Sequence, residues 1–175
     1  MSMKELQQGF SLIETILYVV IMAVILTTIS LFLLNLMNAR AKTRVISEVL
    51  AGAYLVEQRL SEAVRHAEGI RTNESVFSSD PGVLSLDMVD VGRSPTVFSL
   101  TADDGQFQVS EAGGVASIIT PDSINVSNLV FTNVTGPDDV GIVQVQFTIQ
   151  TLAGAGSQAF IYDQAFQTTL RIPLD

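Results

Sequence analysis

The chain contains no charged side chain between Thr15 and Ala39, and the most apolar part of this stretch runs from Ile16 to Leu34. These 19 residues are long enough, as a helix, to span the hydrocarbon core of a bilayer. One carboxylate, that of Glu14, directly precedes them. Because ionisable groups in such segments are costly and rare, Glu14 requires a functional explanation.

After Arg40 the sequence changes from uniformly apolar to one-sided. Apolar residues then recur at steps of three and four, as they do on one face of a helix, and charged residues occupy the other faces. No proline occurs before Pro81, so we expect one helix from about Ser11 to about Glu68, ended near Gly69. The apolar stripe consists of Ile46, Val49, Leu50, Ala53, Val56, Leu60, Ala63, Val64 and Ala67.

Residues after Arg71 lose the helical period and alternate between apolar and polar side chains. The segment 143–150 alternates at every step, which is typical of a half-buried strand. Turn formers such as Asp80-Pro81-Gly82 separate the alternating segments. We therefore expect an α+β fold, in which the helix stripe packs on a mainly antiparallel β-sheet head. The expected strands are 83–88, 96–100, 106–110, 115–119, 124–133, 142–150 and 165–172.

Charge and composition exclude several functional classes. The formal net charge of -9 disfavours nucleic-acid binding, which needs clustered Lys and Arg. Residues 74–175 carry two basic side chains against twelve acidic ones, which gives -10 for this part. There is no cysteine and only one histidine, His66, so we expect no enzyme, no cofactor and no zinc site. Asp103-Asp104 and Asp138-Asp139 fit ordinary turn chemistry, with calcium binding as an alternative.

The segment Gly9-Phe10-Ser-Leu-Ile-Glu14 follows a short polar leader and directly precedes the apolar run. This arrangement closely resembles the N-terminal motif of the type IV pilin family. The family includes major and minor pilins and the pseudopilins of type II secretion and DNA-uptake systems. The motif resemblance covers roughly residues 1–35, and the head resembles the family only loosely, in segments such as 123–132 and 166–171.

The resemblance implies a processing role for Gly9, which would precede the bond cut by a prepilin peptidase on the cytoplasmic side. Phe10 would become the new N-terminal residue, methylated on its amine by the same enzyme, and Glu14 would serve subunit assembly. The implied partners are this peptidase, other pilin or pseudopilin subunits, the inner-membrane assembly platform and the lipid bilayer. The implied location is a single pass in the cytoplasmic membrane with the head outside the cytoplasm, followed by a pilus or pseudopilus.

These features together predict four segments. They are a leader at 1–9, a transmembrane assembly helix at 10–39, its amphipathic half at 40–70, and a β-rich globular head at 71–175. Many major pilins have a helix-bending proline and a C-terminal disulfide, and this chain has neither. The departures favour a minor pilin, with a minor pseudopilin of a secretion or DNA-uptake system as the alternative. Motility, adhesion, secretion and DNA uptake stay open.

Two interpretations outside the family also apply to the apolar run. A secretory signal peptide cut near Ala39-Arg40-Ala41 is disfavoured, because the run is too long and the leader lacks net positive charge. An uncleaved, membrane-anchored binding module, in which Glu14 is incidental, is favoured by one observation. Arg40, Lys42 and Arg44 follow the run, and the positive-inside rule would place the head in the cytoplasm, opposite to the family's orientation.

Overall fold

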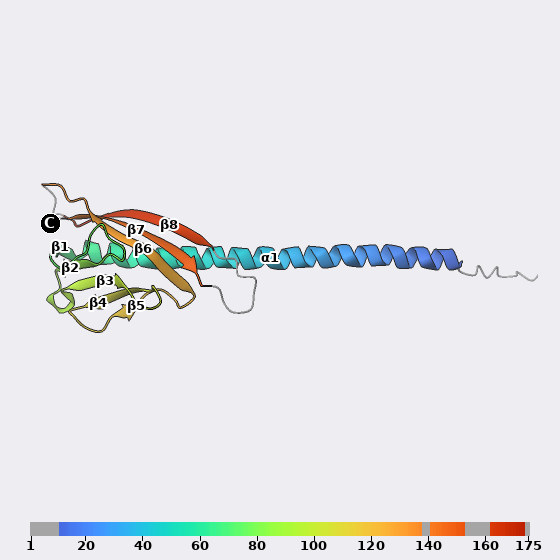
Figure 1. Ribbon diagram of the computed structural model, residues 1–175, viewed down its shortest axis with the longest axis horizontal. Coiled ribbons are helices and arrows are strands. Elements are labelled where there is room, and N and C mark those ends of the chain that lie inside the picture. Colours follow the sequence, from blue (N-terminus) through green and yellow to red (C-terminus); the bar gives the residue numbers. More distant parts are fainter. Residues whose placement is uncertain (1–10, 138–140, 153–161, 174–175) are drawn as a thin grey trace, which may run out of the picture. The chain divides into compact units, whose positions relative to one another are not determined.

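The computed structural model divides the chain into two compact units, Met1–Lys42 and Thr43–Asp175. One helix, α1, extends from Leu12 to Arg65 and contributes to both units (Figure 1). The residues that the structure describes are 11–137, 141–152 and 162–173.

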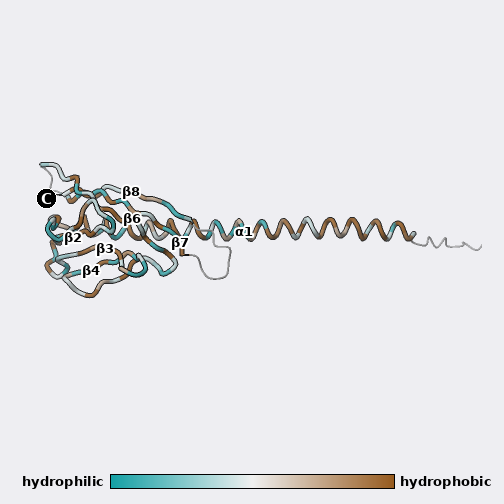
Figure 2. Tube along the Cα trace, viewed as in Figure 1, coloured by the Kyte–Doolittle hydropathy of each residue, from teal (hydrophilic) through white to brown (hydrophobic). Residues whose placement is uncertain are grey.

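The first unit contains the N-terminal part of α1, and every side chain from 11 to 42 is exposed. Hydrophobic colours dominate this stretch in Figure 2. Its hydroxyl groups bond within the helix, because Thr27, Thr28 and Ser30 each donate to the carbonyl four residues earlier at 2.8 Å. These hydroxyls and the helical backbone are thus satisfied without water, as a lipid environment demands.

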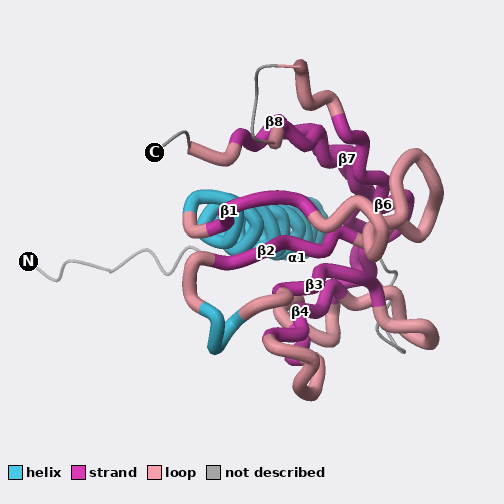
Figure 3. The backbone as a smooth tube through the Cα atoms, turned by 90° about the vertical axis from the view of Figure 1, so that its left-hand side faces the viewer, coloured by secondary structure: helices cyan, strands magenta, loops and turns pink. Residues whose placement is uncertain are grey.

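The second unit combines the C-terminal part of α1 with two antiparallel sheets, where we expected one. A five-stranded sheet has the order β1-β2-β3-β4-β5, and a three-stranded sheet has the order β6-β7-β8. In a view along α1, the two sheets lie on different sides of the helix (Figure 3). The strands are β1 Ala67–Ile70, β2 Leu84–Met88, β3 Thr96–Leu100, β4 Phe107–Glu111, β5 Ser117–Ile118, β6 Ile124–Asn133, β7 Ile142–Thr151 and β8 Asp163–Arg171.

The sheets cover most of the expected apolar stripe of α1, but Leu50, which the sequence pattern placed in the stripe, is 50% exposed. Val49, Val56 and Leu60 have no exposed surface. Gly52 lies on the same face, and a β carbon there would come within 2.6 Å of Ile124 Cδ1 on β6. The missing side chain therefore lets β6 approach the helix closely. A stripe built from i, i+3 and i+4 positions is broad, and this breadth allows one helix to serve two sheets.

The alternating pattern located the strands well. The expected strands 96–100 and 124–133 coincide with β3 and β6, and the other bounds shift by one or two residues. Each sheet also carries a stacked aromatic pair across neighbouring strands. The ring centroids of Phe98 and Phe107 lie 5.7 Å apart, and those of Phe147 and Phe166 lie 5.5 Å apart. These rings enlarge the apolar faces that the two sheets bury.

The helix ends at Arg65, three residues earlier than expected, and Ala67–Ile70 forms β1 instead of a last helical turn. The N–H of His66 donates to the carbonyl three residues earlier at 3.1 Å, a tight bond typical of a helix end. Ala67 keeps its apolar side chain buried, but it does so as a strand residue. Gly69 is a poor helix former and lies at a register irregularity in the β1–β2 pair.

The one-sided packing of α1 predicts unequal effects of two matched substitutions. Leu60→Ala removes a fully buried side chain and should lower the free energy of unfolding by about 2–5 kcal/mol. Leu50→Ala changes a side chain that is 50% exposed and should lower it by less than about 1 kcal/mol. Urea unfolding of the full chain in detergent micelles, followed by near-UV circular dichroism, measures both. Equal losses would contradict this packing.

Candidate functional site

Of the expected processing residues, Gly9 and Phe10 lie outside the part of the chain that the structure describes. Glu14 is described and lies in the first turn of α1, where its side chain is exposed. Its backbone N–H donates to the carbonyl of Ser11 at 3.0 Å, and the Tyr18 hydroxyl donates to its Oε1 at 3.5 Å. A carboxylate at this position interacts favourably with the positive end of the helix dipole.

The helix that carries Glu14 is long and apolar enough to cross a membrane. The most apolar window of α1 has none of its residues buried within the protein. Length and composition thus permit a membrane span. They leave the direction of the crossing open.

The basic residues that follow the apolar run are exposed on α1. Arg44 donates from Nε to Glu48 Oε1 at 3.1 Å, one helical turn further along. The side chain of Arg44 is 82% exposed, so this pair contributes little to stability. Arg40 and Arg44 are four residues apart and lie on one face of the helix, whereas Lys42, two residues from each, lies on the opposite side.

His66 satisfies a backbone group at the end of α1. Its Nδ1 lies 2.8 Å from the carbonyl oxygen of Glu62. Because a carbonyl oxygen only accepts, Nδ1 carries the hydrogen of this bond. The last carbonyls of a helix lack intrahelical donors, and His66 supplies one. His66 is therefore paired with its own helix.

The described ranges contain no group of three or more His, Asp or Glu side chains arranged to hold a metal ion. Asp103 and Asp104 are exposed in the turn between β3 and β4. The backbone carbonyl of Asp104 accepts from Asn125 Nδ2 at 2.7 Å, so this turn is attached to β6. Asp138 and Asp139, the second expected turn pair, lie outside the described residues.

Two arginines hold the five-stranded sheet and its loops together. Arg71 bonds to Asp87 and, at 3.3 Å, to Glu74. Arg93 bonds to Glu111 at 2.7 Å and thereby connects the loop after β2 with the end of β4. The hydrogen bond to Asp87 raises the pKa of the Arg71 guanidinium, and that to Glu111 raises the pKa of Arg93, although burial opposes both shifts. Both arginines stay charged and act as structural braces.

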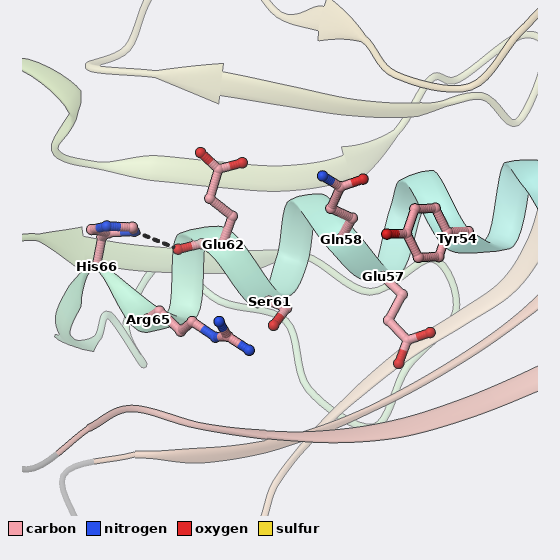
Figure 4. A pocket seen from close by; sticks show the side chains of 7 residues that line it. All are labelled: Tyr54, Glu57, Gln58, Ser61, Glu62, Arg65 and His66. Atoms are coloured by element: carbon pink, nitrogen blue, oxygen red, sulfur yellow. Dashed lines mark hydrogen bonds between the residues drawn. The ribbon is translucent and has the colours of Figure 1, made fainter.

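A hollow of about 460 Å³ lies along the face of α1 that the apolar stripe leaves open. The side chains from α1 project into it between strands that flank the helix (Figure 4). On one flank, Thr168 of β8 donates from Oγ1 to Glu57 Oε1 at 3.3 Å. The lining consists of Tyr54, Glu57, Gln58, Ser61, Glu62, Arg65 and His66.

The sequence interpretation did not identify this hollow, although a signal for it was present. Tyr54, Gln58, Ser61 and Arg65 recur at steps of four, three and four, which defines a second line along the helix. Because most of these residues are polar, the pattern is equally typical of a solvated face. Only the positions of the two sheets distinguish a hollow from a flat surface.

Comparisons of this chain with protein-family models, with curated proteins and with solved structures found no match. A function for the chain therefore has to be inferred from its own residues.

The apolar part of α1 yields a prediction about membrane association. Ile25→Arg places a cation near the middle of the apolar segment, where insertion scales assign a cost of about 2.5–3.5 kcal/mol. This variant should lose resistance to extraction from membranes by alkaline carbonate. Leu50→Arg introduces the same side chain on the same helix, beyond the apolar segment, and should remain resistant. Full resistance of Ile25→Arg would contradict a membrane-spanning role for this part of α1.

Proposed function

We propose that this chain is a structural subunit of a type IV pilus or pseudopilus, and specifically a minor one. The observation that carries the proposal is the segment from Gly9 to Glu14, joined directly to an apolar run. The start of α1 at Leu12 supports it, because Glu14 then lies in the first turn of the helix. The antiparallel head supports it by burying the stripe that α1 exposes after the apolar segment.

The charges that cleavage would create give a physical reason for a glutamate at position 14. Cleavage after Gly9 creates a cationic amine at Phe10, and Glu14 lies four residues further along. Opposite charges attract far more strongly next to an apolar phase than in water. A carboxylate deep in a spanning helix costs about 2.5–3.5 kcal/mol, and less near the interface. When a subunit joins a helical bundle, pairing Glu14 with the amine of a neighbour removes part of this cost only at the correct stagger.

The role assigns partners to the chain and no chemistry of its own. A prepilin peptidase cuts after Gly9 and methylates Phe10. The apolar part of α1 anchors the subunit in the cytoplasmic membrane and then packs against other subunits, delivered by the inner-membrane assembly platform. The head lies outside the cytoplasm. Many major pilins have a helix-bending proline and a C-terminal disulfide, and this chain has neither. This difference supports a minor subunit. The assembly is either a pilus or the pseudopilus of a secretion or DNA-uptake system.

A second function, an uncleaved membrane-anchored binding module, is favoured by Arg40, Lys42 and Arg44. By the positive-inside rule these charges retain the head in the cytoplasm. Glu14 then has no assembly role, and the head binds a cytoplasmic partner. The two functions differ in the orientation of the head and in processing after Gly9, so measuring both properties distinguishes them.

Processing after Gly9 predicts a defined mass for the mature protein. In cells with an active prepilin peptidase, the membrane-extracted chain should lack residues 1–9 and carry one added methyl group, as measured by intact-mass spectrometry. The same chain made in cells lacking the peptidase is the control and should retain its leader. Retention of the leader in both strains, together with a head that resists protease added outside spheroplasts, would favour the anchored binding module.

Pairing of Glu14 with the amine of a neighbouring subunit predicts that Glu14→Leu separates membrane insertion from filament assembly. The variant should enter the membrane as well as the unmodified chain, because the substitution removes a charge from an apolar boundary. The fraction recovered in sheared filaments or in cross-linked subunit complexes should fall about tenfold, the effect of losing about 1.4 kcal/mol of pairing. Glu48→Leu, the matched change further along α1, should assemble normally. Normal assembly of Glu14→Leu would refute the pairing role.

A further inference from the structure

Strand β8 ends the three-stranded sheet and presents an open edge within the described part of the chain. It pairs with β7 over its whole length of nine residues, from Asp163 to Arg171. In the order β6-β7-β8 it is a terminal strand. A strand edge of this length, without proline, is a template on which another extended chain can add.

The ladder to β7 defines which backbone groups of β8 face outward. Just after the strand, Ile172 donates its N–H to the carbonyl of Gly141 at 2.9 Å. Backbone groups alternate between the two edges of a strand, so the even-numbered residues from Phe166 to Leu170 bond to β7. The N–H groups that face outward belong to Ala165, Gln167 and Thr169.

The opposite edge of the same sheet is closed. On β6, the carbonyl of Phe131 accepts from Ser78 N–H at 2.8 Å, and that of Leu129 accepts from Gly82 N–H at 2.7 Å. The N–H of Val126 donates to Gly105 at 2.8 Å. Loops thus occupy the backbone groups of β6, and this is how proteins usually protect sheet edges. Beside β8, the described residues supply no such loop.

The open edge and the hollow on α1 adjoin each other. Thr168 of β8 reaches Glu57 of the hollow with a hydrogen bond of 3.3 Å. The sheet curves around α1 from β6 through β7 to β8 (Figure 3), and β8 is both its last strand and the strand that contacts the hollow through Thr168. One additional strand would therefore use the outward backbone groups and cover the hollow at the same time.

We infer that β8 and the hollow together form a docking site for an extended segment of a different protein, which adds to the sheet as a fourth strand. Backbone hydrogen bonds to Ala165, Gln167 and Thr169 provide binding, and alternate side chains of the segment enter the hollow. Tyr54, which is 66% exposed, offers an aromatic surface to one of these side chains.

The charge of the head indicates the chemistry of the segment. Residues 74–175 carry -10, and the lining of the hollow contains two carboxylates, Glu57 and Glu62, against one guanidinium, Arg65. Two copies of this head would repel each other, whereas a segment rich in Lys or Arg is attracted. The partner is therefore a basic segment of another polypeptide and not a second copy of this chain. This docking site is independent of leader cleavage and of Glu14.

Site-specific cross-linking in the cells that produce the chain tests the site. The photoreactive residue p-benzoylphenylalanine replaces Thr169, and illumination should link the full chain to a basic segment of a different protein, identified by mass spectrometry. Gln167→Pro in the same chain removes one outward N–H without touching the β7 ladder and should reduce the cross-link about tenfold.

A matched control comes from the edge of the other sheet. Ile118 of β5 also directs its N–H outward, because the adjacent Ile119 donates to Phe107 at 2.8 Å. Ile118→Pro should keep the cross-link and unfold at the same temperature as Gln167→Pro. No cross-link, a link to lipid or to a second copy, or equal reduction in both proline variants would overturn the inference.

Hydrogen exchange of backbone amides provides a second test of the docking site. It uses the unsubstituted full chain, so the result does not depend on whether a proline variant folds. The cross-linked segment, synthesised as a peptide and added to the chain in detergent micelles, should slow exchange at Ala165, Gln167 and Thr169. The amides of Phe166 and Thr168, already bonded to β7, should change little. Binding of the peptide without slower exchange at the outward amides would exclude strand addition.

Discussion

The burial of one stripe of α1 is the interaction on which the head depends. The five-stranded and three-stranded sheets are separate ladders, so no strand pairing within the described ranges joins them. Val56 and Leu60 have no exposed surface, and Gly52 allows Ile124 to approach the helix axis. The same helix must therefore satisfy two solvents, with apolar side chains on all faces before Arg40 and on one broad face after it.

The sequence allowed the fold to be predicted to the level of its elements. Alternation located β3 and β6 to the residue, because each has one face on the core and one toward water. It did not reveal β1, since Ala67 fits the helical stripe and the strand in equal measure. It also did not reveal that the strands divide into two sheets. Both outcomes depend on contacts between distant residues, such as Gly52 with Ile124, which leave no local pattern.

The candidate sites differ in how much of each could be predicted from the amino-acid sequence. The proposed cleavage motif, Gly9 to Glu14, is a linear segment, so it could be proposed before any fold was considered. The described structure adds only that Glu14 belongs to the first turn of α1. The outward amide of Gln167 is the reverse case. Its direction follows from the pairing of β8 with β7, and a shift of one residue in that register would turn it inward.

The two edges of the three-stranded sheet differ, and this difference limits the explanations for the open edge at β8. Among the described residues, Ser78 and Gly82 close β6 while no loop closes β8. Folding stability alone gives no reason for this difference, because exposed backbone groups on either edge are equally able to bond to water. The tendency to aggregate does differ between the two edges, because an open edge without proline can pair with strands of other chains. Residues 74–175, with a charge of -10, repel other copies of this chain at that edge and still admit a basic partner. Charge thus protects β8 selectively, and a covering loop would have closed it to every partner.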